Sequence, residues 1–178
     1  MGRIVTRQVK TCLSDIVCVV VGSLLIGLSA QVTVPMIPVP MTMQVYTVLM
    51  VGGVLGAKRG FAAVALYLAE GAFGLPVFSN GTGGLCVFLS PRAGYLLGMP
   101  ISAFIVGYLT ENWQNKSFSE HVIVGLLGLV PIDTFGILFL GLALKDFFQA
   151  LAVGLYPFIV VDAFKVLLFA GSLKAFRR

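Results

Sequence analysis

The chain carries no charged side chain from Ile16 to Ala57, and several later stretches are almost as bare. Overall, 58% of its residues are hydrophobic and 11% are charged, against about 45–50% apolar and about 25% charged residues in a typical soluble domain. So few charges cannot cover a water-soluble surface. Because about 20 apolar residues cross the hydrocarbon core of a bilayer, the sequence predicts an integral membrane protein.

Backbone amides in lipid must form hydrogen bonds within their own segment, so the apolar stretches are predicted to be helices. The expected fold is a single all-α transmembrane domain over residues 1–178, with six membrane helices and a short interfacial helix at 145–155. The six membrane helices are predicted at residues 14–32, 42–57, 60–73, 93–109, 120–144 and 157–176.

Two uncharged segments interrupt the helical pattern. Residues 34–40 contain three prolines, which remove backbone donors and favour extended backbone. Residues 76–91 are rich in glycine and contain an Asn-Gly turn signal at Asn80. Irregular backbone at membrane depth is tolerated only where protein covers it or where it lines a cavity. The segment 76–91 is therefore a candidate cavity wall.

Six crossings place both termini on the same side of the membrane. Nine basic residues then lie on the terminal side and two lie on the other, with Lys165 inside the last helix. The nine are Arg3, Arg7, Lys10, Lys58, Arg59, Lys116, Lys174, Arg177 and Arg178, and the two are Arg92 and Lys145. By the positive-inside rule the termini are predicted to be cytoplasmic, and the glycine-rich loop between helices three and four faces outward.

The composition also excludes several classes of function. Basic cytoplasmic loops account for the net charge of +5, so no nucleic-acid partner is expected. The three cysteines show no spacing typical of a zinc site or a disulfide framework, and neither a metal nor a cofactor is predicted. The sequence offers one histidine and no acidic ligand set, which argues against an enzyme. Polar residues gathered near the outer end argue against a channel.

The strongest candidate site residues are Asp162 and Lys165, in the last predicted helix. Residues three apart share one face of a helix, so the two can pair with each other or with a ligand. Each costs about 2.5–3.5 kcal/mol at the centre of a lone membrane helix, and this cost predicts that both face the interior of the bundle. A helix–helix ion pair without a ligand is the alternative.

Arg92, Tyr95 and Asn80 are the other candidate ligand-binding residues. A guanidinium binds a carboxylate through two hydrogen bonds, although a lone arginine at a helix end commonly extends to the membrane surface instead. Asn80 can donate and accept, as an amide or urea ligand requires; a plain turn is its alternative. With Phe78 and Phe158 as apolar neighbours, the set suits a small molecule with an acid at one end and a polar ring at the other.

Three further ionisable residues receive structural roles. Glu70 is expected to tie the third helix to the outer loop, and His121 is expected to be exposed at the inner surface. Asp133 could partner a buried cation, act as a neutral acid held by Thr134, or contact the cavity; a structural role is favoured.

Several ordered motifs resemble those of the BioY family, the biotin-specific substrate-capture (S) components of energy-coupling-factor (ECF) transporters. The resemblance covers nearly the whole chain from the proline segment onward. The motifs are Val39-Pro40-Met41-Thr42-Met43-Gln44, Tyr67-Leu68-Ala69-Glu70-Gly71-Ala72-Phe73-Gly74-Leu75-Pro76-Val77-Phe78, Gly83-Gly84, Ser90-Pro91-Arg92-Ala93-Gly94-Tyr95-Leu96-Leu97-Gly98, and Pro157-Phe158 with Asp162 and Lys165.

The resemblance implies a vitamin transporter subunit of a bacterial cytoplasmic (inner) membrane that binds biotin tightly and takes part in its uptake. An S component for another small vitamin is the alternative. By position, Asn80, Asp162 and Lys165 would contact the ureido ring, Arg92 and Tyr95 the valerate carboxylate, and Phe78 and Phe158 the thioether ring.

The phosphate-binding pattern Gly-x-x-x-x-Gly-Lys-Ser/Thr is absent from the chain, which therefore cannot hydrolyse ATP by that route. The resemblance supplies the partners: a transmembrane coupling (T) subunit and two ATPase subunits. Small residues on the first helix, Cys18, Gly22, Ser23 and Gly27, allow close helix docking and are candidates for the interface with these partners. Internal packing is the alternative for each.

Overall fold

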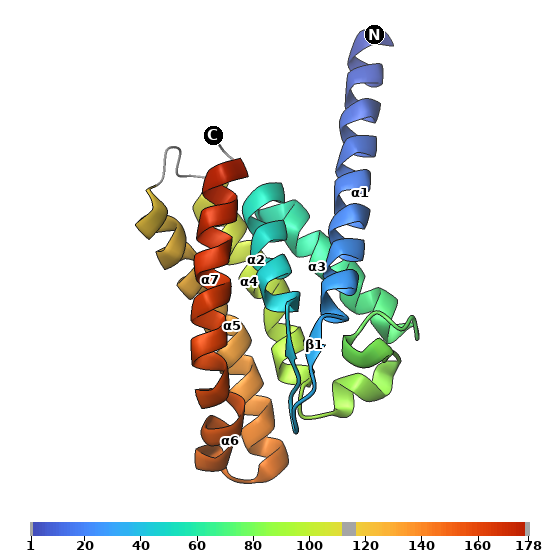
Figure 1. Ribbon diagram of the computed structural model, residues 1–178. Helices are drawn as coiled ribbons and strands as arrows, with labels where there is room; N and C mark the ends of the chain where they lie inside the picture. Colours follow the sequence, from blue (N-terminus) through green and yellow to red (C-terminus); the bar gives the residue numbers. More distant parts are fainter. Residues whose placement is uncertain (1, 112–116, 177–178) are drawn as a thin grey trace.

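The computed structural model describes residues 2–111 and 117–176, with side chains from residue 13 onward. These residues form an all-α fold with one short hairpin and two 3-10 turns (Figure 1). The helices are α1 (Gly2–Ala30), α2 (Gln44–Leu55), α3 (Ala57–Ala72), α4 (Ala93–Glu111), α5 (Phe118–Leu144), α6 (Phe147–Gly154) and α7 (Tyr156–Phe176). Each predicted helix is present, so the predicted all-α class is confirmed.

Local sequence explains where several helices begin and end. Gly56 adopts a φ of 85°, which favours glycine, and it separates α2 from α3. The Ala57 amide at the start of α3 donates to the Glu111 carboxylate at 3.1 Å, an arrangement that the positive end of a helix dipole favours. Ser117 and Glu120 form a reciprocal capping box at the start of α5.

The two irregular segments have short regular pieces. The proline segment is the loop of an antiparallel hairpin, in which β1 (Thr33–Val34) pairs with β2 (Met41–Thr42). The glycine-rich loop contains the 3-10 turns η1 (Ser79–Gly81) and η2 (Leu85–Leu89). The expectation of extended and turn-rich backbone in these segments is therefore confirmed.

Helix length and composition match a multi-pass membrane protein. In the described part of the chain, α1, α4 and α5 are long and apolar enough to cross a bilayer, and α6 with α7 is a fourth candidate, bent by 43°. Helices α2 and α3 are shorter, with 12 and 16 residues. Four candidate spans are thus present, and the count of six crossings stays a prediction.

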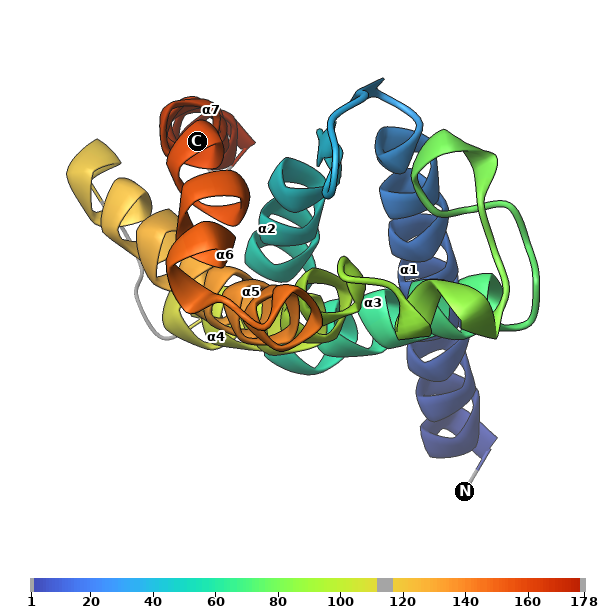
Figure 2. The same ribbon diagram turned by 90° about the horizontal axis from the view of Figure 1, so that it is seen from below.

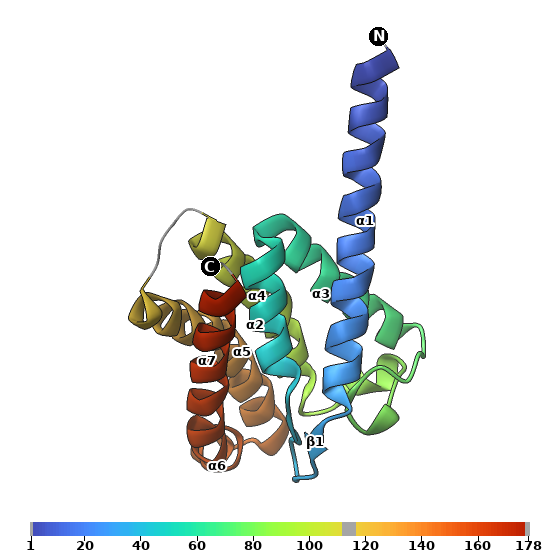
Figure 3. The same cartoon turned by 45° about the horizontal axis from the view of Figure 1, so that its top comes forward.

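The helices divide the molecule into two ends. The first turns of α1 and the last turns of α7 lie at one end, whereas the hairpin, the 3-10 turns and α6 lie at the other (Figure 1). Helix α1 contacts α2, and the segment that contains the hairpin connects the two (Figure 2). Helix α3 contacts α1, α2 and α4 and joins α1 to the rest of the bundle (Figure 3).

Helix α1 uses its small residues for packing within the chain. A Cβ on Gly22 would lie 3.0 Å from the Ala63 side chain of α3, and a Cβ on Gly27 would lie 3.5 Å from Val77. Ser23 is fully buried against α3. Gly22, Ser23 and Gly27 are thus buried by α2, α3 and the following loop, which favours the internal-packing alternative, and their role at a partner interface stays a prediction. Cys18 is half-buried, and its role at an interface stays a prediction.

Two structural predictions need correction. The Glu70 carboxylate accepts a hydrogen bond from Ser23 at 2.5 Å, so this side chain ties α3 to α1 rather than to the outer loop. His121 is buried with 3% of its surface exposed, and its Nδ1 lies 2.8 Å from the Ser117 carbonyl oxygen. His121 is buried because it lies on the inward face of the first turn of α5. The expectation that it is exposed relied on the neighbouring Glu120, which does not determine the direction of the His121 side chain.

Glycines set the close contacts between the central helices. A Cβ on Gly52 of α2 would lie 2.9 Å from the Cα of Ala103 in α4. On α4, a Cβ on Gly94 or Gly98 would meet the backbone of α5. Small residues of this kind let membrane helices approach until their backbones touch. The relative positions of α2, α4 and α5 therefore depend on the absence of side chains at these points.

We predict that Gly52→Ala lowers the thermal stability of the purified protein in detergent by several degrees, because the new methyl group clashes with α4. The cost expected for overpacking a buried contact is about 1–3 kcal/mol. Gly171→Ala on α7 is the matched control, since a Cβ there meets no atom within 4 Å. Equal melting temperatures for the two variants would contradict the role of Gly52.

Candidate ligand-binding site

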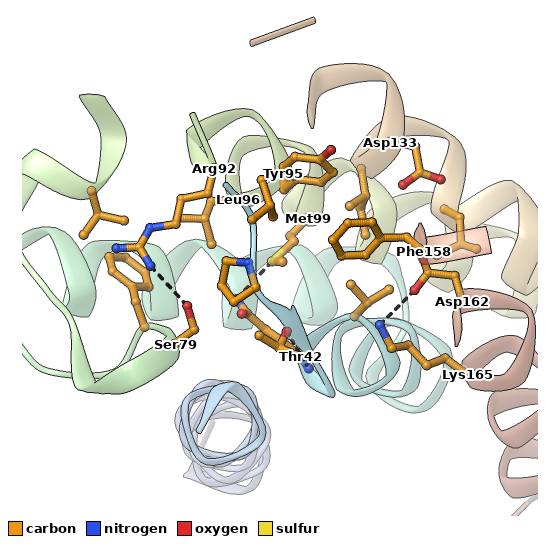
Figure 4. Close-up of a pocket in the computed structure, with 18 residues that line it drawn as sticks. Thr42, Ser79, Arg92, Tyr95, Leu96, Met99, Asp133, Phe158, Asp162 and Lys165 are labelled. Atoms are coloured by element: carbon orange, nitrogen blue, oxygen red, sulfur yellow. Dashed lines mark hydrogen bonds and ion pairs between the residues drawn. The ribbon is translucent and has the colours of Figure 1, made fainter. Parts of the chain in front are cut away.

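A cavity lies between the central helices, near the end of the molecule that holds the hairpin and the 3-10 turns (Figure 4). The space between its lining residues that no atom fills is about 630 Å³, including the open solvent at its mouth. Its polar lining residues are Thr42, Gln44, Ser79, Arg92, Tyr95, Asp133, Asp162 and Lys165. Its apolar lining residues are Val39, Pro40, Val45, Phe78, Val87, Leu96, Met99, Leu129, Ile132 and Phe158.

Asp162 and Lys165 form an ion pair in the wall of this cavity. The Lys165 Nζ donates to Asp162 Oδ1 at 2.8 Å, as their spacing on α7 allows. Both side chains are buried and face inward, as predicted. An ammonium has three donors and a carboxylate has two acceptor oxygens, so each partner retains hydrogen-bonding capacity for a ligand.

Arg92 lies at the start of α4, and its guanidinium faces the glycine-rich loop. Nη1 donates to Ser79 Oγ and Nη2 donates to Thr82 Oγ1, each at 3.3 Å. Among the described residues Arg92 has no carboxylate partner. The side chain therefore contributes a positive charge to the cavity instead of extending to the membrane surface, and this charge is available to an anion.

Tyr95 and Phe158 form an aromatic wall. Their rings are stacked with centroids 6.3 Å apart. The Tyr95 hydroxyl donates to the Gly154 carbonyl at the end of α6, at 2.8 Å. Because this hydroxyl is directed to α6 whereas Arg92 is directed to the loop, the structure does not bring the two groups together on one anion. Tyr95 still lines the cavity with its ring.

The glycine-rich loop contributes Phe78 but not Asn80. Phe78 is buried, lines the cavity, and contacts the Tyr67 ring edge to face with centroids 5.4 Å apart. Asn80 is exposed and absent from the lining. Its backbone adopts a left-handed conformation, with φ 59° and ψ 31°, which asparagine tolerates in turns. The geometry therefore favours the plain-turn alternative for Asn80, and its contact with a ligand stays a prediction.

Sequence reasoning overlooked three polar lining residues, Thr42, Gln44 and Ser79, and favoured another role for Asp133. Gln44 at the start of α2 is buried, and its amide donates to the Tyr67 hydroxyl at 2.9 Å. The position of Gln44 at the end of the Val39–Gln44 motif could have identified it as a lining residue. Asp133 on α5 lines the cavity together with Asp162 and Lys165, so the favoured structural role for Asp133 gives way to the cavity contact that was its alternative. An acid inside an apolar helix was the signal there.

The arrangement separates two polar regions by an apolar one. Figure 4 shows Arg92 on one side, the Asp162–Lys165 pair on the other, and Tyr95, Leu96, Met99 and Phe158 between them. Such a cavity can hold a small molecule with an anionic end and a hydrogen-bonding end.

The comparisons with known proteins agree with this geometry. The sequence profile of the BioY family matches residues 5–178. A protein of Thermotoga maritima named biotin transporter BioY is 41% identical over 122 residues, which cover 68% of this chain and 71% of that protein. A protein of Rhizobium etli with the same name is 43% identical over 124 residues, and the alignment covers 65% of each chain.

A solved structure is also similar. The crystal structure of the S-component for biotin from an ECF-type ABC transporter superposes with a TM-score of 0.83 at 27% sequence identity. The superposition covers 94% of this chain and 93% of the other. Since the family profile spans nearly the whole sequence and the fold agrees over the same length, the chain belongs to the BioY family.

Proposed function

We propose that this chain binds biotin and serves as the substrate-specific subunit of an ECF-type biotin transporter. Relatives named biotin transporter and the similar S-component structure support this function. The observation that carries it is the placement of Arg92 and the Asp162–Lys165 pair on opposite sides of one cavity. Biotin has the matching chemistry, with a carboxylate on a flexible chain at one end and a urea ring at the other. The chain is a transport protein and not an enzyme.

The proposed binding mode follows from the position of each group. Arg92 binds the valerate carboxylate, because a guanidinium is the most suitable partner for a carboxylate. Asp162 accepts from a ureido N–H, and Lys165 donates to the ureido oxygen. Phe78, Tyr95 and Phe158 cover the thioether ring and the chain. Asn80 has no part in this mode.

The proposed setting is a bacterial cytoplasmic (inner) membrane with six crossings and cytoplasmic termini. The two short helices α2 and α3 would complete the six, with α6 and α7 as one bent crossing. The cavity would then open outward, on the side of the hairpin and the glycine-rich loop. A T subunit and two ATPase subunits would supply the coupling to ATP, since this sequence has no phosphate-binding loop.

Equilibrium binding to the purified chain tests the proposed function directly. We expect saturable binding of biotin at one site per chain, and no competition from lipoate, thiamine or riboflavin at matched concentrations. A preference for any of these three would instead identify an S component for another vitamin. Absence of saturable binding to all four would refute the function.

We predict that Asp162→Asn and Lys165→Met each weaken biotin binding by at least about 100-fold, because removing one partner of a buried pair leaves an uncompensated charge that typically costs about 3–5 kcal/mol. The measurement is biotin retention by membranes that contain equal amounts of each variant. Lys174→Met is the matched control, since Lys174 lies on the same helix but does not line the cavity. Unchanged retention in both site variants would refute the location of the site.

Arg92→Ala should weaken the binding of biotin more than that of biotinamide, because only biotin carries the carboxylate. The expected difference is about 10–100-fold, from the loss of a hydrogen bond to a charged group worth about 1.5–3 kcal/mol. Competition of both ligands against labelled biotin measures it. Arg59→Ala provides the control, because Arg59 pairs with Asp15 outside the cavity. Equal losses for the two ligands would remove Arg92 from the carboxylate role.

A further inference from the structure

Asp133 is the one carboxylate in the described cavity lining that lacks a hydrogen-bond or ion-pair partner among the described residues. It lies on α5, where the apolar neighbours Leu129 and Ile132 share the lining. Asp162, in contrast, accepts from Lys165 at 2.8 Å. An unpaired carboxylate in low-dielectric surroundings is costly when ionised. The Asp133 carboxylate can be stabilised by solvent, by a cation, by protonation or by a hydrogen-bond donor of a ligand.

The charged groups that line the cavity balance one another before a ligand enters. Arg92 and Lys165 are positive, and Asp133 and Asp162 are negative. The ionisable groups of the packed helices that share the cavity lining with Asp133 are Asp162 and Lys165 on α7 and Tyr95 on α4. Helix α6 carries no ionisable side chain, and Tyr46 of α2 donates to Ser172 away from the cavity.

An anionic ligand upsets this balance. Biotin brings one negative charge into the cavity. With Arg92 bound to the valerate carboxylate and Lys165 bound to Asp162, no described cation is left to compensate Asp133. The bound state would then contain one excess negative charge in surroundings of low dielectric constant, where uncompensated charges cost most.

We infer that biotin binds to this chain together with one proton, and that Asp133 is the residue that accepts it. The inference rests on the proposed function and adds a second ligand to the same site. The proton comes from solvent and forms an O–H bond on the Asp133 carboxylate, which restores a neutral cavity. A neutral carboxyl group can donate as well as accept, so protonated Asp133 can donate to the ureido oxygen or accept from a ureido N–H.

Proton uptake fixes the sign of the pH dependence. Because the complex holds one more proton than the free protein and free biotin, binding must weaken as the pH rises. Where a full proton is taken up, the dissociation constant rises about tenfold per pH unit. In the range where Asp133 is already protonated before binding, the affinity becomes independent of pH.

Isothermal titration calorimetry of biotin in buffers of different ionisation enthalpy, at one pH, counts the protons taken up. We expect uptake approaching one proton per biotin in the pH range where the affinity falls as the pH rises. Asp133→Asn should show no uptake and a pH-independent affinity for the binding that remains. Asp133→Ser provides a second variant without the carboxyl group, and uptake that persists in either variant overturns the assignment. Asp146→Asn, at the exposed N-cap of α6, is the matched control and should retain uptake.

Biotinamide separates this inference from a general effect of pH on the protein. The amide carries no charge, so its binding to the unaltered chain should take up no proton, whereas biotin should. Equal uptake for the two ligands would overturn the charge-balance argument. Biotin binding without uptake would refute this inference alone, and absence of biotin binding would refute the proposed function itself.

Discussion

The cost of placing charge in an apolar environment determines how this chain is organised. Helix α7 shows the constraint directly: Val160, Phe164 and Leu167 are exposed on its outer surface, whereas Asp162 and Lys165 are buried on its inner one. Apolar side chains on the outside cost nothing when lipid surrounds the helix, but ionised groups there would cost several kcal/mol each. The remaining helices must therefore cover the inner surface of α7, and the cavity lies where they do so.

The same constraint explains why the helices were predictable from sequence. Uncharged stretches ended by glycine, proline or charged residues predicted the helices within a few residues, because lipid allows the backbone few other conformations. The exception is the start of α1, which lies at Gly2 and not at residue 14, because a helix can continue beyond the apolar stretch into charged sequence. The extended backbone of residues 34–40 followed from the prolines, whereas the pairing of β1 with β2 did not, because it depends on the chain reversing direction. What the sequence could not establish was the number of crossings. Helices α2 and α3 have 12 and 16 residues, and their spans depend on how the bundle sits in a membrane.

Site residues were predictable only where placing the side chain in lipid would cost free energy. Asp162, Lys165 and Arg92 are expensive in lipid, so the inward positions expected for them were correct. Asn80 is exposed outside the described lining; a turn residue is equally stable exposed, and its motif does not reveal which way the loop faces. The small residues Gly22, Ser23 and Gly27 suit any close contact. Whether that contact is α3 or a partner depends on tertiary packing, which spacing along one helix does not encode.

Recognition at the cavity also depends on contacts that never touch it. Gly94 and Gly98 let α4 approach the backbone of α5, and this approach sets Arg92 relative to Asp133. Gly125 of α5 packs closely against Val166 and Phe169 of α7. This contact fixes the distance between Asp133 on α5 and the ion pair on α7. Since electrostatic energy varies steeply with distance at low dielectric constant, a side chain at either contact would change the balance among the charges. Helix packing and ligand recognition therefore depend on the same residues, because the glycines that stabilise the bundle also hold its ionised groups in position.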